Sequence, residues 1–231
     1  MKLLQVALLA LAVAAAPAQE QSIKFGVIAP EGSPWYNILR DMSESWKSAT
    51  NGKVAFKIYP GGVAGDEPDM VRKMRVGQLH AAALTSAGLS EIIPEITGLQ
   101  LPMLFRDFEE LDYVMAKVAP RLEKSLKDKG FTVLNWGEAG WVTFYCKNPV
   151  FSMADLRREK LFVWAVASSD VAAWKDIGVT AVPLATTEIH TGLKSGLVTA
   201  IQATPLAALS FQWFGSAKNM TDLRWVPLIG A

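Results

Sequence analysis

Residues able to carry out nucleophilic or metal chemistry are few in this 231-residue chain, which has one cysteine, Cys146, and two histidines, His80 and His190. A catalytic triad or a metal site needs such groups in characteristic arrangements, and no local pattern places either histidine beside the cysteine. The sequence also contains no G-x-S-x-G nucleophile elbow and no H-E-x-x-H metal motif. We therefore expect no enzyme, no metal and no cofactor, with Cys146 a buried free thiol and His80 structural. An extracytoplasmic enzyme is the weaker alternative.

The elements that must position any site are clearest between Lys160 and Pro205. Three short apolar runs in this stretch are typical of buried strands: Leu161–Val166, Thr180–Pro183 and Leu197–Ile201. Two helices are predicted between them, from Ser168 or Ser169 to Gly178 and from Thr186 or Thr187 to Gly196, because hydroxyls cap helix starts and glycine ends helices. Strands that alternate with helices predict a parallel α/β layer. Ligands bind such layers beyond the carboxyl ends of the strands, here residues 164–168, 183–187 and 202–205.

The flanking parts of the chain are also predicted to mix strands and helices. Further strands are expected at Ile23–Ala29, Lys53–Tyr59, Phe131–Trp136, Trp141–Cys146 and Leu223–Ile229, with a break at Gly137–Gly140. Further helices are expected from Pro34 through Trp46, from an Asp107 cap, over Arg121–Lys129 and after Pro205. Pro120 is interpreted as the boundary between the Asp107-capped helix and its successor.

Composition and the amino terminus indicate an exported globular protein. Hydrophobic residues make up 51% of the chain and charged residues 19%, which suits a sizeable core, and the net charge of +1 argues against nucleic acid as a partner. Met1–Ala18 is interpreted as a signal peptide, with Lys2, an apolar stretch and an A-x-A cleavage site that leaves a mature start near Gln19. A membrane anchor is the less favoured alternative, because the apolar stretch is shorter than the ~20 residues of a span. We expect a periplasmic protein that does not itself span the membrane.

The pattern V-P-L-x-x-x-E-I at Val182–Ile189, followed by G-L-V at Gly196–Val198 and Q-x-x-P at Gln202–Pro205, carries a family resemblance. It resembles the DctP-type periplasmic solute-binding subunits of tripartite ATP-independent periplasmic (TRAP) transporters, and moderate matches extend from Ile23 to about Gly230. The resemblance implies an α/β fold, a periplasmic-binding-protein-like clamshell of two lobes joined by crossing strands. It implies lobe I at 19–140, lobe II at 141–206 and a return segment at 207–231. Members of the family normally continue further, so we expect a fragment or a short member with lobe II incomplete.

The same resemblance implies a function and a set of ligand-binding residues. A protein of this type captures a small organic ligand and delivers it to membrane permease subunits; service to a sensor or another non-transport partner is the alternative. The residues that the resemblance and the strand ends place at the interlobe cleft are Ser33, Trp35, Thr85, Ser86, Trp136, Glu138, Trp141, Phe162, Trp164, Thr187, Gln202 and Thr204.

One departure from the family bears on the ligand. Family members usually hold a ligand carboxylate with an arginine in the strand at Leu161–Val163, and here Phe162 occupies that position. Aromatic residues accumulate at the expected cleft instead, so the sequence predicts an apolar or amphiphilic ligand in preference to a simple carboxylate. A cationic or zwitterionic solute, caged by tryptophan faces and Glu138, is the alternative.

Overall fold

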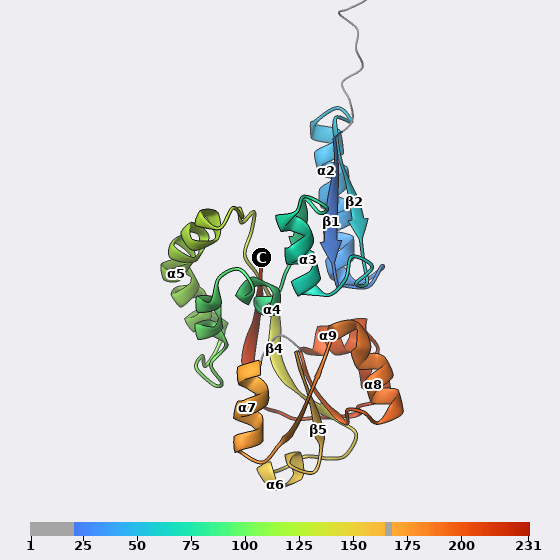
Figure 1. The fold of residues 1–231 in the computed structure, drawn as a ribbon, viewed down its shortest axis with the longest axis vertical. Helices are drawn as coiled ribbons and strands as arrows, with labels where there is room; N and C mark the ends of the chain where they lie inside the picture. Colours follow the sequence, from blue (N-terminus) through green and yellow to red (C-terminus); the bar gives the residue numbers. More distant parts are fainter. Residues whose placement is uncertain (1–20, 165–167) are drawn as a thin grey trace, which may run out of the picture.

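Two α/β lobes, each with its own sheet, lie one above the other in the computed structural model of the chain (Figure 1). The structure describes residues 21–164 and 168–231, so the expected signal peptide, Met1–Ala18, lies outside the described residues. The α/β clamshell predicted from the sequence is therefore confirmed at the level of fold. Within the described ranges, no helix is long and apolar enough to cross a membrane.

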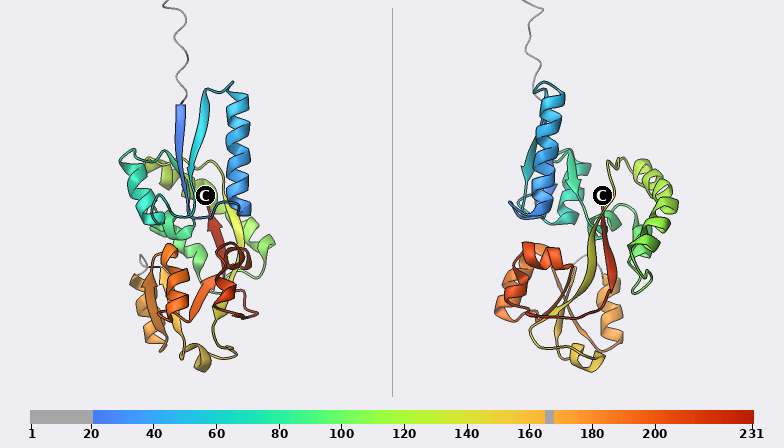
Figure 2. Two further views of the ribbon diagram at one scale, coloured as in Figure 1. Left: turned by 90° about the vertical axis from the view of Figure 1, so that its right-hand side faces the viewer. Right: turned by 180° about the vertical axis from the view of Figure 1, so that it is seen from behind.

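Lobe I is built on a parallel sheet with the strand order β2-β1-β3. Its strands are β1 (Gln21–Val27), β2 (Val54–Tyr59) and β3 (Ala81–Ala83), and its helices are α2 (Pro34–Ala49), α3 (Glu67–Arg75), α4 (Ser86–Ser90), the 3-10 helix η2 (Pro94–Gln100) and α5 (Phe108–Asp128). Helix α2 covers one face of the sheet, where Leu39 and Met42 pack against Phe25 and Val27. Figure 2 shows α2 alongside β1 and β2, and α5 on the far side of the lobe.

Lobe II contains the parallel α/β layer that the sequence predicts. Its elements are β5 (Lys160–Trp164), β6 (Thr180–Leu184) and β7 (Ala200–Ala203), with α6 (Met153–Leu156), α7 (Ser168–Asp176), the 3-10 helix η3 (Thr186–Glu188), α8 (Ile189–Ser195), α9 (Pro205–Ser210) and the 3-10 helix η4 (Trp213–Gly215). Strand β5 pairs in parallel with β6 and β7. Strand β7 begins three residues later than predicted, because the Val198 amide donates a hydrogen bond to the Gly192 carbonyl of α8 and not to a neighbouring strand. The predicted glycine stop at Gly196 is confirmed, with a left-handed φ of 76°.

Two long strands connect the lobes. Strand β4 (Gly137–Cys146) pairs near its start with β9 (Val226–Gly230), and near its end with β7 and the two-residue β8 (Asn219–Met220). Figure 2 shows β4 and β9 running side by side from the lower lobe to the upper one. In lobe I, Leu84 and Ala231 exchange two backbone hydrogen bonds of 2.8 and 2.9 Å. The boundary expected between residues 140 and 141 falls inside β4.

Three local predictions around α5 and β4 are wrong. Helix α5 continues through Pro120 without a break, because Leu111, Leu122 and Leu126 keep one buried face along the whole helix. Residues 131–136 form no strand; Phe131 and Val133 pack against the core of lobe I without strand pairing. Residues 137–140 do not interrupt a strand but begin β4, and the glycines allow a bulge there, with φ of 99° at Gly140.

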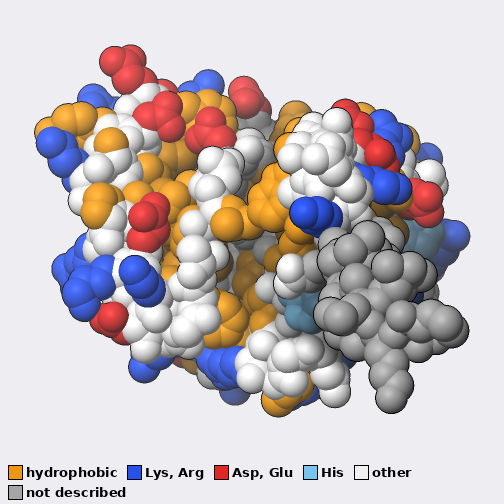
Figure 3. Space-filling model, turned by 90° about the horizontal axis from the view of Figure 1, so that it is seen from above, with side chains coloured by type: hydrophobic (Ala, Val, Ile, Leu, Met, Phe, Trp, Pro, Cys, Tyr) orange, Lys and Arg blue, Asp and Glu red, His pale blue; other side chains and the backbone are white. Residues whose placement is uncertain are grey.

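Hydrophobic side chains remain exposed on parts of lobe I. Leu101, Met103 and Leu104, which precede α5, are each about half exposed or more. Seen from above, hydrophobic side chains line the depression between the α5 side and the side built on β1 and α2 (Figure 3).

Candidate functional site

The lobes meet where the N-terminus of α2 faces the end of β5. Ser33 caps α2 by accepting a hydrogen bond from the Tyr36 amide (3.3 Å), and Pro34 occupies the first helical position, as predicted. The next residue, Trp35, is half-buried and packs against the β1 face of lobe I as well as against the core of lobe II around Phe162. Trp35 therefore bridges the apolar cores of the two lobes.

A polar bond lies in the same contact. Asp66 caps α3, and its Oδ1 accepts a hydrogen bond from the Glu67 amide at 3.0 Å. Its second oxygen, Oδ2, accepts a hydrogen bond from the Thr186 amide of lobe II at 2.9 Å. The Thr186 hydroxyl in turn accepts a hydrogen bond from Nε1 of Trp164 at 3.2 Å. The carboxyl end of β5 and the start of η3 are thus tied to the first residue before α3.

The backbone of lobe I also touches Thr187. Gly62 has φ of 78°, and a Cβ added there would overlap the Thr187 methyl group. Glycine is required at this position for both the conformation and the close approach. We call the set of Trp35, Gly62 and Asp66 with Trp164, Thr186 and Thr187 the interlobe contact.

A buried carboxylate lies directly behind the interlobe contact. Glu67 is 3% exposed, and its Oε2 accepts hydrogen bonds from the Thr85 amide (3.0 Å), the Thr85 hydroxyl (2.8 Å) and the Gly88 amide (2.7 Å). Its Oε1 is buried and has no hydrogen-bond partner among the described residues. Burial raises the pKa of Glu67 to about 7, and its three hydrogen bonds oppose that rise. Sequence reasoning missed Asp66 and Glu67, although adjacent acids at a helix start were visible.

The predicted ligand-binding residues occupy different places in the two lobes, and several are buried, with Ser33 and Ser86 each 7% exposed. Trp35, Trp164 and Thr187 come together at the interlobe contact, and Thr85 and Ser86 lie in the turn that Glu67 holds. Others are enclosed: Phe162 and Thr204 are 0% exposed and Gln202 is 8% exposed. Phe162 lies in the core of lobe II, 5.0 Å from Trp164 between ring centroids, so it offers no surface to a ligand in this structure.

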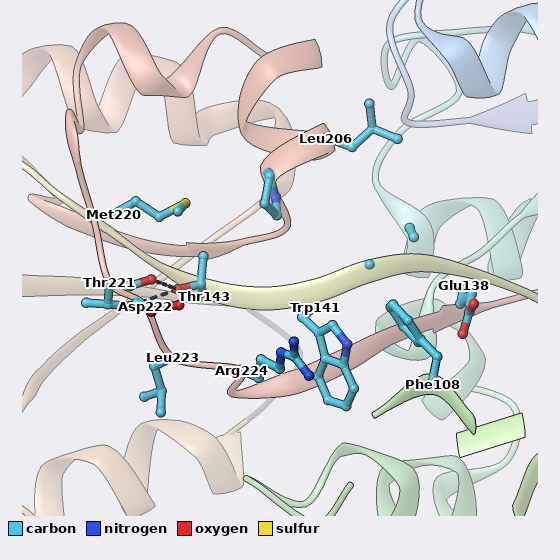
Figure 4. A pocket seen from close by; sticks show the side chains of 13 residues that line it. Phe108, Glu138, Trp141, Thr143, Leu206, Met220, Thr221, Asp222, Leu223 and Arg224 are labelled. Atoms are coloured by element: carbon cyan, nitrogen blue, oxygen red, sulfur yellow. Dashed lines mark hydrogen bonds between the residues drawn. The ribbon is translucent and has the colours of Figure 1, made fainter. Parts of the chain in front are cut away.

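Three other predicted residues lie away from the interlobe contact. Trp136 packs on the core of lobe I, and its Nε1 donates a hydrogen bond to Glu123 of α5 at 2.9 Å. Glu138 and Trp141 line an open pocket of about 480 Å³ beside β4, between the start of α5 and α9 (Figure 4).

Aromatic and charged side chains form much of that pocket's wall. Trp141 packs against Phe108 with ring centroids 5.2 Å apart, and the Arg224 guanidinium lies 6.0 Å from the Trp141 ring. Partial burial, and secondly Asp112, raise the pKa of Glu138. Within the described residues, no cluster of three or more potential ligands could hold a metal ion.

Two α/β lobes, joined by crossing strands and in contact through polar and aromatic side chains, form the architecture of a two-lobed binding protein. The chain belongs to the DctP family, the bacterial extracellular solute-binding proteins of family 7, which matches residues 25–223. The TRAP-type resemblance of the sequence is thereby confirmed.

Among curated proteins, the chain is similar to a solute-binding protein of Roseobacter denitrificans, with 27% identity over 215 residues. It is similarly related to the 2,3-diketo-L-gulonate-binding periplasmic protein YiaO of Escherichia coli, with 27% identity over 214 residues. These matches cover 92% and 90% of this chain. They cover 65% of each relative, so the chain spans slightly less than two thirds of the length of these relatives.

Solved structures of TRAP periplasmic solute-binding proteins have the same fold. One from Xanthobacter autotrophicus Py2, with bound β-D-galacturonate, superposes with a TM-score of 0.82 at 26% identity and covers 90% of this chain and 70% of that one. Another from Citrobacter koseri, with bound D-glucuronate, superposes with a TM-score of 0.80 at 25% identity. The match covers 91% of this chain and 72% of the Citrobacter koseri chain.

Proposed function

We propose that this protein is the solute-binding component of a TRAP-type uptake system, which captures a small sugar acid in the periplasm and delivers it to membrane permease subunits. The observation that carries the proposal is the interlobe contact. A ligand that touches Trp35 on one lobe and the Trp164–Thr187 region on the other favours the closed state, because only that state offers both sets of contacts. Release to the permease then requires the lobes to separate about β4 and β9.

The proposed ligand class replaces the apolar ligand that the sequence predicted. That prediction relied on Phe162 in place of the family's arginine and on aromatic residues gathering at one cleft. Phe162 is, however, enclosed in lobe II, and Trp136 donates a hydrogen bond to α5. Two family members with solved structures hold uronates, and the Escherichia coli relative is named for a keto sugar acid. Hydroxyl and amide groups around Thr187, together with two tryptophan faces, suit a ligand with many hydroxyl groups and an apolar ring face.

The predicted site residues become a narrower proposal. Direct ligand contacts are proposed for Trp35, Trp164 and Thr187, which have exposed surface at the interlobe contact. Ser33, Thr85 and Ser86 are proposed to support the lobe I wall through the caps that they form or adjoin. The buried residues Phe162, Gln202 and Thr204 are proposed to shape lobe II behind that surface.

Calorimetry and thermal unfolding of the protein from Gln19 onward test the proposal. The titrants are D-glucuronate and D-galacturonate, with glycine betaine as the zwitterionic comparison and phenylacetate as the amphiphilic comparison. A sugar acid at 100 times its Kd stabilises the folded state by about 2.7 kcal/mol and raises the midpoint accordingly. A shift with betaine or phenylacetate alone would overturn the sugar-acid assignment, and no shift with any titrant would overturn the binding function.

A further inference from the structure

Two adjacent carboxylates at the start of α3 contact opposite sides of the interlobe contact. Asp66 reaches the Thr186 amide of lobe II, and Glu67 reaches the Thr85–Gly88 turn of lobe I. We propose that Asp66 and Glu67 are a positioning pair, which holds the two walls of the ligand site in register without contacting the ligand. This inference rests on the proposed function, since it assigns a role within the same site.

Asp66 makes one hydrogen bond more than a helix cap needs. A capping carboxylate needs one oxygen, and Oδ1 fills that role by accepting from the Glu67 amide. The second oxygen accepts from the Thr186 amide across the lobe boundary, at 2.9 Å. Thr186 is 5% exposed, so its amide would be buried without a partner if Asp66 moved away while the lobes stayed closed. The bond therefore favours closure and fixes the segment that carries Thr187.

The geometry at Glu67 is equally specific. Three donors from one turn converge on Oε2, and a Cβ at Gly88 would lie only 2.8 Å from that oxygen. The turn begins α4 and carries Thr85 and Ser86, two residues of the proposed lobe I wall. Because the Thr85 hydroxyl already donates to Glu67, it acts as a support and is not free to donate to a ligand. Glu67 thus orders a turn that the backbone alone leaves with unpaired donors.

Asp66 holds the Thr186 segment and Glu67 holds the Thr85 turn, and the two residues are neighbours at the start of α3. A shift of α3 moves Asp66 and Glu67 together, so the Thr186 segment and the Thr85 turn cannot be displaced independently. Gly62, just before this turn, lies against Thr187, so the two lobes already touch at that point. The pair therefore couples the closure of the lobes to the shape of the lobe I wall.

The test for Asp66 uses Asp66→Asn with Asp69→Asn as a matched control. The asparagine keeps a capping oxygen but places an amide donor opposite the Thr186 N–H. Asp69 lies in the same helical turn, and its side chain is 42% exposed and paired with Arg72, so its substitution removes the same charge without touching lobe II. Spin labels at Glu44→Cys and Lys194→Cys, both exposed positions on opposite lobes, report the interlobe distance; the buried Cys146 stays unlabelled.

We expect Asp66→Asn to lengthen and broaden the interlobe distance distribution without ligand and to raise the Kd for D-glucuronate at least tenfold. Asp69→Asn should leave the interlobe distance distribution and the Kd for D-glucuronate as they are in the unsubstituted protein. If the two variants give the same distance distribution, Asp66 does not position lobe II. This comparison needs no ligand, so it stands even if D-glucuronate does not bind and the proposed function fails.

The test for Glu67 compares Glu67→Ala with Glu67→Gln. The glutamine oxygen can accept the same three hydrogen bonds, whereas alanine leaves them unmade. We expect hydrogen exchange at the Thr85 and Gly88 amides to accelerate more than tenfold in Glu67→Ala and to be restored in Glu67→Gln, with the Kd for D-glucuronate following the same order. Equal exchange at these amides in both variants would refute the positioning role of Glu67.

Discussion

Glu67 makes the stability of the fold depend on pH in a direction opposite to that of most carboxylates. Its pKa is raised from 4.5 to about 7, so between these values the folded state keeps a proton that the unfolded chain releases. The contribution of Glu67 to the free energy of unfolding is fully present below pH 4.5 and is lost as the pH rises through about 7. At 1.36 kcal/mol per pH unit, the free energy of unfolding falls by about 3 kcal/mol across this window.

Glu67→Gln should remove this dependence, since the glutamine keeps the acceptor for Thr85 and Gly88 and carries no charge. We expect the variant to gain about 3 kcal/mol over the unsubstituted protein between pH 4.5 and pH 8. Urea unfolding followed by tryptophan fluorescence, at half-unit pH steps, measures the difference. Glu91→Gln, at an exposed position, is the control and should follow the unsubstituted protein throughout. Parallel pH curves for Glu67→Gln and the unsubstituted protein would refute the raised pKa of the buried Glu67.

Three further substitutions test the packing around the site. Phe162→Arg should cost more than about 4 kcal/mol in unfolding free energy, because it buries a charge in lobe II; a variant that folds normally in a chemical melt would contradict the enclosure of Phe162. Gly62→Ala should hold the lobes apart, since its methyl overlaps Thr187. Small-angle scattering should show a larger radius of gyration than for Gly61→Ala, because Gly61 also has a left-handed φ but has open space around its Cβ position. Thr204→Ala should cost about 1 kcal/mol through loss of the α9 cap to Ala207, and an unchanged melting midpoint would argue against that cap.

Local signals predicted much of the fold. In lobe II the glycine at 196 marked the end of a helix, and alternation of strands and helices between Lys160 and Pro205 predicted a parallel layer that the structure contains. Errors arose where tertiary contacts override local rules. Pro120 removes one hydrogen bond from α5, but the continuous buried face on both sides of it outweighs that loss.

The site was less predictable than the fold. The resemblance placed Trp35, Trp164 and Thr187 near the lobe boundary, and the structure does bring these three together. The resemblance could not show that the Phe162 side chain is buried in lobe II, because the family has an arginine at this position. Arginine favours an exposed position, whereas phenylalanine favours burial. Asp66 looked like a helix cap, and its second role depends on Thr186, which is 120 positions away in the sequence.

The return of β9 to lobe I has a consequence for the order in which the protein folds. The parallel strands of lobe II lie within residues 160–203, so their contacts close short loops. Lobe I instead needs Ala231 to reach Leu84 across 147 positions of chain, from 84 to 231. Closing a loop of that length demands more chain entropy and slows the step. We therefore infer that lobe II forms early and that the pairing of β9 with lobe I forms later, which leaves apolar surfaces of lobe I open to misassociation until β9 docks.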